Sequence, residues 1–328
     1  MDVASFFAQV WFAQAQQALD RVPSIEAVPT VWPTSPPGTV ATVSTLFGPT
    51  IMFTAVLPDG NIVFPCGTQV FFVTPGGTVS VLAGAANTNG STDGVGTNAL
   101  FELLFGIAVL QDGNIVVGDQ NCVRIITYPG GVVSTLAGGQ STYGFDDGVG
   151  SSATFNFITS VAVLLDGNIA VSDLNNNAIR IITYPGGAVS TLCVISGSMW
   201  NIAVLPDGNI LPIIPCIYLT IVSYPGGVAS VLVPQTPLFS FDEQYSAAVV
   251  PSNGTILLGF PNNIRVISYP AGKISITPLV GSDEPGYVNG NGTSARFNNI
   301  TSITVNPLTN QIIVSDAGNG VLRLITPT

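Results

Sequence analysis

The sequence predicts an all-β fold, a six-bladed β-propeller of four-stranded antiparallel blades closed by an N-terminal strand. Three observations predict it. The 328 residues include 36 Gly and 24 Pro, which disfavour a helical protein, and 47% hydrophobic residues, which can fill a large core. A unit of turns and β-rich runs occurs six times along the chain. The last unit lacks its final strand, and a matching segment stands near the N-terminus.

The repeat is marked by a turn that recurs about every 40 to 60 residues, a period typical of propeller blades or solenoid turns. The six turns are Pro58–Asn61, Gln111–Asn114, Leu165–Asn168, Pro206–Asn209, Pro251–Gly254 and Pro307–Asn310. Each turn is followed by a β-rich run.

The third unit shows the four strands of a blade. They are expected at Ser160–Leu164, Asn168–Asp173, Ala178–Tyr184 and Ala188–Leu192. The first pair is joined by Asp166-Gly167, a strong hairpin signal for which we expect positive φ at both turn positions. The last pair is joined by Tyr-Pro-Gly-Gly, where proline sets φ and a following glycine takes the left-handed position.

The two ends of the repeat region are expected to share one blade. The sixth unit supplies Ile303–Val305, Gln311–Asp316 and Val321–Ile325, but no fourth strand. The segment Val40–Leu46 resembles the fourth strands Val132–Leu136 and Ala188–Leu192. We therefore predict that it completes the last blade, which leaves only short, protected edges, and that residues 39–328 form one domain.

The recurring phrases carry a family resemblance. Asp147–Phe155, followed by Asp166–Asn168 and Asp173–Arg180, resembles the NHL repeat of six-bladed β-propellers. The phrase recurs from Asp93 to Arg124 and from Asn289 to Arg323, and the resemblance covers about residues 39 to 328. It implies a propeller with a tendency to bind other molecules, and it implies no reaction.

An acid and an arginine occur together in units two, three and six. The pairs are Asp119 with Arg124, Asp173 with Arg180, and Asp316 with Arg323, whereas units one and four lack both members. Residues that come and go together are most simply explained as an ion pair that ties the second strand of a blade to the third.

Unit five keeps the arginine without the acid. Arg265 stands in the third strand, but Leu258, Gly259 and Phe260 occupy the region where the acid is expected. An unpaired buried guanidinium is costly. Arg265 is therefore exposed to water, paired elsewhere, or free to bind a ligand.

Acidic residues on the inter-blade connections are the candidates for a cation site. They are Asp146, Asp147, Asp242, Glu243, Asp283 and Glu284. Oxygen-rich loops of this kind can bind Ca²⁺, although no EF-hand spacing is present. The turns within blades are expected on one face of the fold and these longer connections on the other. No cofactor is expected, with Ca²⁺ as the one open possibility.

Residues 1–38 stand outside the repeat and form a second region. An apolar stripe at helical spacing predicts an amphipathic helix that ends at Pro23, and residues 28–38 are predicted to form an extended proline-rich linker. The interaction residues expected on the helix are Val3, Phe6, Phe7, Val10, Trp11, Ala15, Ala18 and Val22. Phe12 and Leu19 widen the stripe.

A helix this apolar needs a cover. It packs against its own propeller, against a neighbouring copy, or against a partner protein. Membrane-surface binding is disfavoured because such helices carry Lys and Arg on their polar side, and this one has only Arg21. No spanning segment and no secretion signal are expected.

Composition narrows the function. The formal charge of −11 disfavours nucleic acid as a partner, and the absence of His excludes His-dependent catalysis and the usual zinc chemistry. The first hypothesis is a non-enzymatic protein-interaction or structural assembly subunit whose N-terminal arm docks on a partner or a second copy. A virion or other surface assembly is one setting for it, and the cytoplasm is the other. The alternative is a calcium-dependent propeller hydrolase or lactonase that uses Asp, Glu and Asn.

Cysteines and glycosylation sequons add little. Cys66, Cys122, Cys193 and Cys216 lie far apart without CxxC spacing, so free buried thiols are expected rather than a zinc site or disulfides. The acceptor pattern Asn-X-Ser/Thr occurs at Asn89, Asn253, Asn291 and Asn299. Because this pattern also arises in ordinary turns, we do not expect modification.

Overall fold

The structure is a computed structural model that describes most of the chain. The described residues are 39–44, 53–139, 143–214, 219–233, 246–249, 255–268 and 275–326, with the backbone alone at 39–44, 232–233, 247–249, 268 and 275. The predicted N-terminal helix and linker, Cys216, Asp242, Glu243 and Asn253 lie outside these residues.

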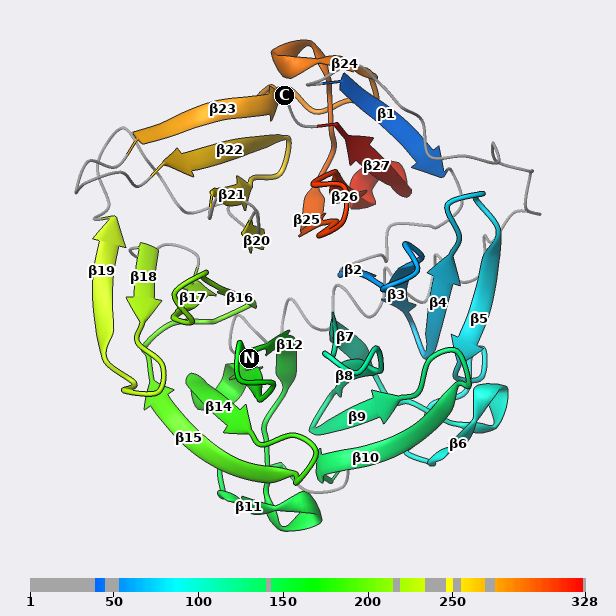
Figure 1. The fold of residues 1–328 in the computed structure, drawn as a ribbon, viewed down its shortest axis with the longest axis vertical. Helices are drawn as coiled ribbons and strands as arrows, with labels where there is room; N and C mark the ends of the chain where they lie inside the picture. Colours follow the sequence, from blue (N-terminus) through cyan, green and yellow to red (C-terminus); the bar gives the residue numbers. More distant parts are fainter. Residues whose placement is uncertain are drawn as a thin grey trace. The chain divides into compact units, whose positions relative to one another are not determined.

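Across the described ranges the chain is all-β, and six antiparallel sheets form the blades of a β-propeller, which confirms the predicted fold class (Figure 1). The chain divides into two compact units. One contains the three sheets within residues 94–233, and the other contains the sheets within residues 39–44 and 246–325. The boundary passes through the sheet of residues 55–83.

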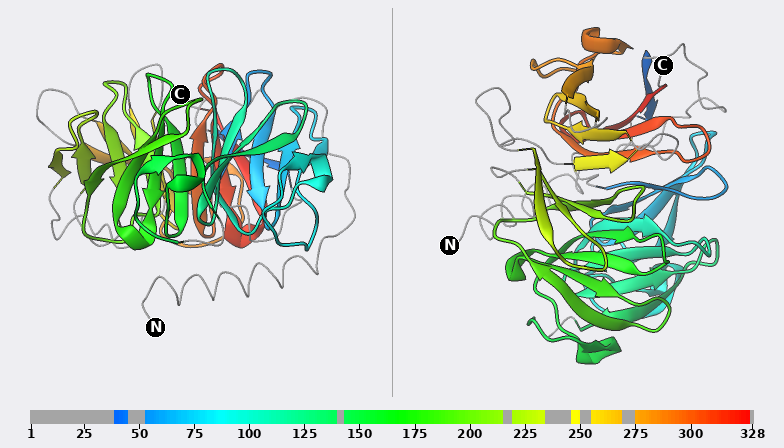
Figure 2. Two further views of the ribbon diagram at one scale, coloured as in Figure 1. Left: turned by 90° about the horizontal axis from the view of Figure 1, so that it is seen from below. Right: turned by 60° about the vertical axis from the view of Figure 1, so that its left-hand side comes forward.

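The unit of residues 94–233 contains three sheets. Their strands are β6 (Gly94–Val95), β7 (Leu104–Val109), β8 (Ile115–Asp119), β9 (Cys122–Ile126), β10 (Val132–Gly138), β11 (Gly148–Val149), β12 (Ile158–Val163), β13 (Ile169–Asp173), β14 (Ala178–Ile182), β15 (Ala188–Val194), β16 (Asn201–Val204), β17 (Ile210–Ile213), β18 (Leu219–Val222) and β19 (Ala229–Val233). The sheet orders are β6-β10-β9-β8-β7, β11-β15-β14-β13-β12 and β16-β17-β18-β19. Short 3-10 turns follow β6, β11 and β13, and Figure 2 shows the sheets from two further directions.

The first strands of these three sheets pack against one another. Ser160 on β12 donates a hydrogen bond to Asn201 Oδ1 on β16 at 3.0 Å. A Cβ at Gly106 on β7 would lie 2.5 Å from the backbone nitrogen of Val161 on β12, so only glycine allows this approach. Buried side chains fill the space between the sheets of β7 to β10 and β12 to β15, and Phe155 among them is fully buried.

The second unit contains the joined ends of the repeat region. Its strands are β1 (Thr39–Ser44), β20 (Ser246–Val249), β21 (Ile256–Gly259), β22 (Asn263–Ser268), β23 (Ser275–Gly281), β24 (Gly290–Asn291), β25 (Ile300–Val305), β26 (Ile312–Asp316) and β27 (Val321–Ile325). They form the sheets β20-β21-β22-β23 and β24-β1-β27-β26-β25. The remaining sheet, at the boundary, is β2 (Ala55–Val56), β3 (Ile62–Cys66), β4 (Gln69–Val73) and β5 (Val79–Ala83).

Strand β1 completes the last blade, as predicted. Val40 lies opposite Ile325, and Ala41 lies opposite Leu324, both on β27. On its other side β1 pairs with β24, where Thr39 lies opposite Asn291. The predicted exchange of strands between the ends of the repeat region is therefore confirmed.

The prediction of four strands per blade is wrong for three of the described sheets. The two-residue strands β6, β11 and β24 add a fifth, outer strand to them. They come from the Asp/Asn-Gly start of the recurring phrase, where the connection folds back along the outer strand; Val95, for example, pairs with Val132. Two residues are too few for a periodicity signal, so the strand pattern did not reveal them.

The Asp-Gly hairpins also differ from the expected form. Positive φ occurs at Gly60, Gly113, Gly167 and Gly208, but at none of the aspartates before them. In the hairpin of Asp166, Gly167 N–H donates to Leu164 O at 3.0 Å, and Asn168 N–H donates to Asp166 Oδ1 at 3.0 Å. The aspartate carboxylate thus holds the turn in the three-residue form that ends on a left-handed glycine. In Tyr-Pro-Gly-Gly the second glycine is left-handed, and the Tyr-Pro bond is cis at Tyr128, Tyr184 and Tyr224.

Tyrosines of these turns bridge neighbouring sheets. Tyr184 Oη donates to Asp112 Oδ2 at 2.7 Å, and Tyr224 Oη donates to Asp166 Oδ2 at 2.7 Å. In this unit the two kinds of hairpin turn therefore share a face, as expected. Slight burial raises the pKa of each aspartate, but hydrogen bonds from the tyrosine and from the asparagine two residues on outweigh it, so both pKa values lie below the ordinary value.

Tyr184→Phe tests this bridge through its pH dependence. A carboxylate with a lowered folded-state pKa contributes stability above its unfolded pKa, and that contribution is lost as pH falls through the folded value. We expect the variant to lose less than about 1 kcal/mol at pH 7, because Asp112 is exposed, and the difference from the wild type to shrink as the pH falls through the lowered folded-state pKa of Asp112. Urea unfolding over a pH series measures this difference. Tyr143→Phe, at a ring that is 74% exposed, is the control; an equal loss in both variants, or a loss that persists in acid, contradicts the bridge.

Candidate functional site

Three arginines on the third strands of three blades are fully buried against aspartates on the second strands. The pairs are Arg124 with Asp119 at 2.9 Å, Arg180 with Asp173 at 2.8 Å and Arg323 with Asp316 at 2.7 Å, and all six side chains are 0% exposed. In each pair, the residue directly opposite the arginine in the sheet stands two positions before the aspartate. Val171, for example, lies opposite Arg180 and two positions before Asp173. Each ion pair joins β8 to β9, β13 to β14 or β26 to β27.

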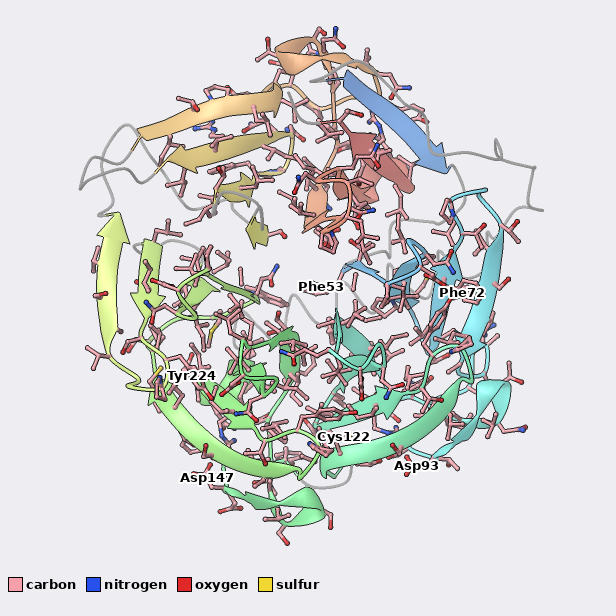
Figure 3. The ribbon with its side chains drawn as sticks, viewed as in Figure 1. Phe53, Phe72, Asp93, Cys122, Asp147 and Tyr224 are labelled. Carbon is pink, nitrogen blue, oxygen red and sulfur yellow. The ribbon has the colours of Figure 1, made fainter. Side chains whose placement is uncertain are left out.

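A second group, which the sequence reasoning missed, completes each arginine site. Nη2 donates to Asp93 at 2.7 Å in the first site, to Asp147 at 2.8 Å in the second and to Asn289 at 2.8 Å in the third. Asp93 and Asp147 also accept hydrogen bonds from outer-strand threonines and lie beside β10 and β15 in Figure 3. The signal was available, because an acid or amide begins the recurring phrase in each unit that has the pair.

Aromatic rings cover these guanidinium groups, one ring at Arg124 (Phe101, 5.3 Å) and two at each of the other two arginines. Arg180 lies 4.9 Å from the ring centroid of Phe145 and 5.1 Å from that of Phe155. Arg323 has the same arrangement with Tyr287 and Phe297. The charge and both Nη groups are thus used within the fold, and among the described residues only the buried Nε of each arginine has no hydrogen-bond partner. These three sites stabilise the blades and offer no charge to a ligand.

Arg265 occupies the same register on β22 but differs in every contact. It lies opposite Leu258, so Phe260 takes the position that the aspartate holds in the other three blades. The guanidinium stacks on Phe260, at 4.6 Å from its centroid, and Nε donates to Asn263 Oδ1 at 3.1 Å. Its ion pair is longer, 3.6 Å to Asp283, and its side chain is 29% exposed. Of the three alternatives, Arg265 is therefore partly exposed and paired elsewhere.

The predicted cation ligands do not come together. Asp147 holds Arg180, Asp146 accepts from Thr154 Oγ1 at 3.1 Å, and Asp283 faces Arg265. Asp242 and Glu243 lie outside the described residues. Over the described ranges, no group of three or more His, Cys, Asp or Glu side chains is placed to hold a metal ion. A guanidinium next to Asp283 also repels a cation from that loop.

The other predicted features are only partly described. No disulfide joins the described cysteines Cys66, Cys122 and Cys193, and Cys122 is buried. Asn89 and Asn291 are exposed, and Asn299 is half-buried with a left-handed backbone. All interaction residues of the N-terminal arm lie outside the described residues. No helix within the described part of the chain has the length and apolar character needed to cross a membrane.

No protein-family model matches the sequence, and no curated protein sequence matches it. The fold, however, is similar to that of several solved structures. An auxiliary nutrient binding protein from Bacteroides thetaiotaomicron matches with TM-score 0.62 and 11% identity over 90% of this chain and 74% of that chain. A gluconolactonase from Xanthomonas campestris matches with TM-score 0.57 and 12% identity over 92% and 98% of the two chains. Virginiamycin B lyase from Staphylococcus aureus matches with TM-score 0.53 and 12% identity over 85% and 84%.

These similarities correct one expectation. The sequence led us to expect that the chain is not an enzyme, but the similar structures include a lyase and a gluconolactonase. The propeller fold is therefore compatible with catalysis, and the absence of His excludes only reactions that depend on a His side chain. At 11 to 12% identity, what these structures share with the chain is the six-bladed propeller fold.

Proposed function

We propose that the chain is an NHL-like propeller that acts as a protein-interaction or assembly subunit, with residues 1–38 docking on a partner protein or on a second copy. The observation that supports it most is the position of β1. Thr39 and Val40 pair with β24 on one side, and Val40 also pairs with β27 on the other. The arm therefore leaves the blade from a strand that is held between two neighbours.

The sequence of the arm supplies the binding chemistry. Its predicted apolar stripe includes Phe7 and Trp11, the aromatic residue types that carry much of the binding energy in protein interfaces. The helix is short of the cationic residues that a membrane-surface helix uses. The apolar stripe of the helix is therefore better suited to bind a protein surface than a membrane surface.

The finer assignment to the NHL repeat rests on the recurring phrase and its buried pair. In three blades the same positions supply the aspartate, the arginine and the Asp or Asn that begins the phrase. In these three units, which resemble the NHL repeat most closely, the arginine links the inter-blade connection to the second and third strands of its blade through hydrogen bonds and the ion pair.

Light scattering on four proteins tests the arm. They are the full chain, a variant lacking residues 1–38, Phe7→Asp and Gln9→Asp. The two substitutions add the same charge, but Gln9 lies on the opposite side of the predicted helix. We expect the full chain and Gln9→Asp to form an assembly larger than a monomer, and the other two proteins to be monomers.

Two outcomes contradict docking on a second copy. If the full chain is a monomer, the arm does not join copies of the chain, and a partner protein is the remaining form of the proposal. If the variant without residues 1–38 keeps the larger mass, assembly uses another surface and the role given to the arm is wrong. Urea unfolding of each variant checks that the propeller stays folded.

A further inference from the structure

The positive charge that the described residues expose is concentrated at one loop. Of the five arginines in the described ranges, Arg124, Arg180 and Arg323 are fully buried. The other two, Arg265 and Arg296, both contact the loop of residues 282–284: Arg265 reaches Asp283, and Arg296 Nη1 donates to Ser282 Oγ at 2.9 Å. On a chain with a formal charge of −11, the arginines of the described residues that are not fully buried thus lie together at this loop, next to Asp283 and Glu284.

A carboxylate already occupies this position. Asp283 Oδ1 accepts from Asn263 Nδ2 at 3.1 Å and lies 3.6 Å from Arg265 Nη2. The side chain of Asp283 is 88% exposed, so little besides these two contacts holds it. Exposed ion pairs contribute at most about 1 kcal/mol. A carboxylate from outside can therefore replace it at small cost.

The residues that bind the Asp283 carboxylate are held in place by more contacts than Asp283 itself. Asn263 and Phe260 are each only 7% exposed. The ring of Phe260 covers one face of the guanidinium, and Asn263 Oδ1 fixes Nε, so the Nη edge of the fork points toward Asp283. Among the described residues Nη1 has no hydrogen-bond partner. A fork held in this way can bind a carboxylate through two parallel hydrogen bonds.

We propose that Arg265, Asn263 and Arg296 form a binding site for the carboxylate of a small acidic ligand, and that Asp283 is the internal group it displaces. Asn263 and Arg265 lie on β22, Asp283 lies directly after β23, and Arg296 lies between β24 and β25, all in the unit of residues 246–325. Arg265 would bind the carboxylate directly, Asn263 would orient both partners, and Arg296 would add positive charge.

The test is a titration of the full chain with succinate, in which binding is monitored through the NMR signal of the Arg265 Nε–H group. Sodium chloride at matched ionic strength is the control. Asp283→Asn removes the internal competitor and is expected to bind about fivefold more tightly, the factor that corresponds to about 1 kcal/mol. Glu284→Gln removes the same charge from the next residue, whose backbone oxygen accepts hydrogen bonds from Ser282 Oγ and Arg296 Nη1, and is expected to change the affinity by less than about twofold. Arg265→Gln, followed through the neighbouring Asn263 amide, is expected to abolish saturable binding.

The following results would overturn the proposal. Equal gains in Asp283→Asn and Glu284→Gln would show that only net charge matters. Saturable binding that survives Arg265→Gln would place the ligand elsewhere, and no saturable binding in Asp283→Asn would show that there is no site. A parallel titration with inorganic phosphate separates the ligand classes, since tighter binding of phosphate than of succinate would refute the assignment to a carboxylate.

Discussion

Replacing Arg180 by methionine is expected to destabilise the protein by about 3 to 5 kcal/mol, because it leaves a charge buried without its partner. Asp173 is 0% exposed and would keep only hydrogen bonds from Asn156 N–H and Asn176 Nδ2. Asp147 would lose its guanidinium partner as well. Methionine fills much of the volume between the rings of Phe145 and Phe155, so the loss reports mainly on charge.

Arg265→Met is the matched control in the same register. That side chain is 29% exposed and its ion pair is 3.6 Å long, so we expect a loss below about 1 kcal/mol. Urea unfolding of both variants gives the comparison. Equal losses of unfolding free energy would mean that burial does not determine how much these arginines stabilise the fold. The structural role assigned to the three buried pairs would then be wrong.

A pH series adds a second readout for Arg180→Met. Burial raises the pKa of Asp173 above its ordinary value, even with hydrogen bonds from Asn176, Asn156 and Arg180. Removing Arg180 raises it further. A carboxyl with a raised folded-state pKa favours folding most below its unfolded pKa, and this advantage is lost as pH rises through the folded value. The gap between variant and wild type should therefore narrow as pH falls from 7 toward about 4.

The blades could be predicted because their signals are local. Asp-Gly and Tyr-Pro-Gly-Gly turns lie between runs of alternating or continuous apolar residues, and such turns leave few choices for the strands they join. The match between residues 40–46 and the outer strands of other units was enough to find β1. The turn geometry was predicted less well, because the carboxylate of Asp166 bonds to the backbone of its own turn.

The contacts that distinguish the arginines could not be predicted in the same way. Asp147 lies 33 residues from Arg180 in the sequence, and the two meet only because the connection folds back over the blade. For Arg265, the spacing left three residues in the place of the acid, and only the register of Leu258 opposite Arg265 shows that Phe260 takes it. The partner Asp283 comes from the next connection, which no pattern within unit five contains.

Deleting residues 1–44 is expected to destabilise the protein by about 4 kcal/mol or more, whereas deleting residues 1–38 leaves its stability nearly unchanged. The first deletion removes β1, which faces β27 at Val40, Ala41, Thr42 and Ser44. Each backbone hydrogen bond contributes about 0.5 to 1.5 kcal/mol, and the edge of β27 is opened as well. Arg323, which lies opposite Thr42 and is fully buried, would gain solvent on that side.

A peptide of residues 39–52 provides the decisive comparison, because a strand can be supplied from outside to an open sheet edge. Adding it should raise the thermal midpoint of the variant that lacks residues 1–44 in a concentration-dependent manner. The variant that lacks residues 1–38 keeps its own β1 beside β27, so the same peptide should leave it unchanged. Equal midpoints for the two deletion variants would mean that β1 contributes nothing to the last blade, and a response of both to the peptide would place its binding somewhere other than the edge of β27.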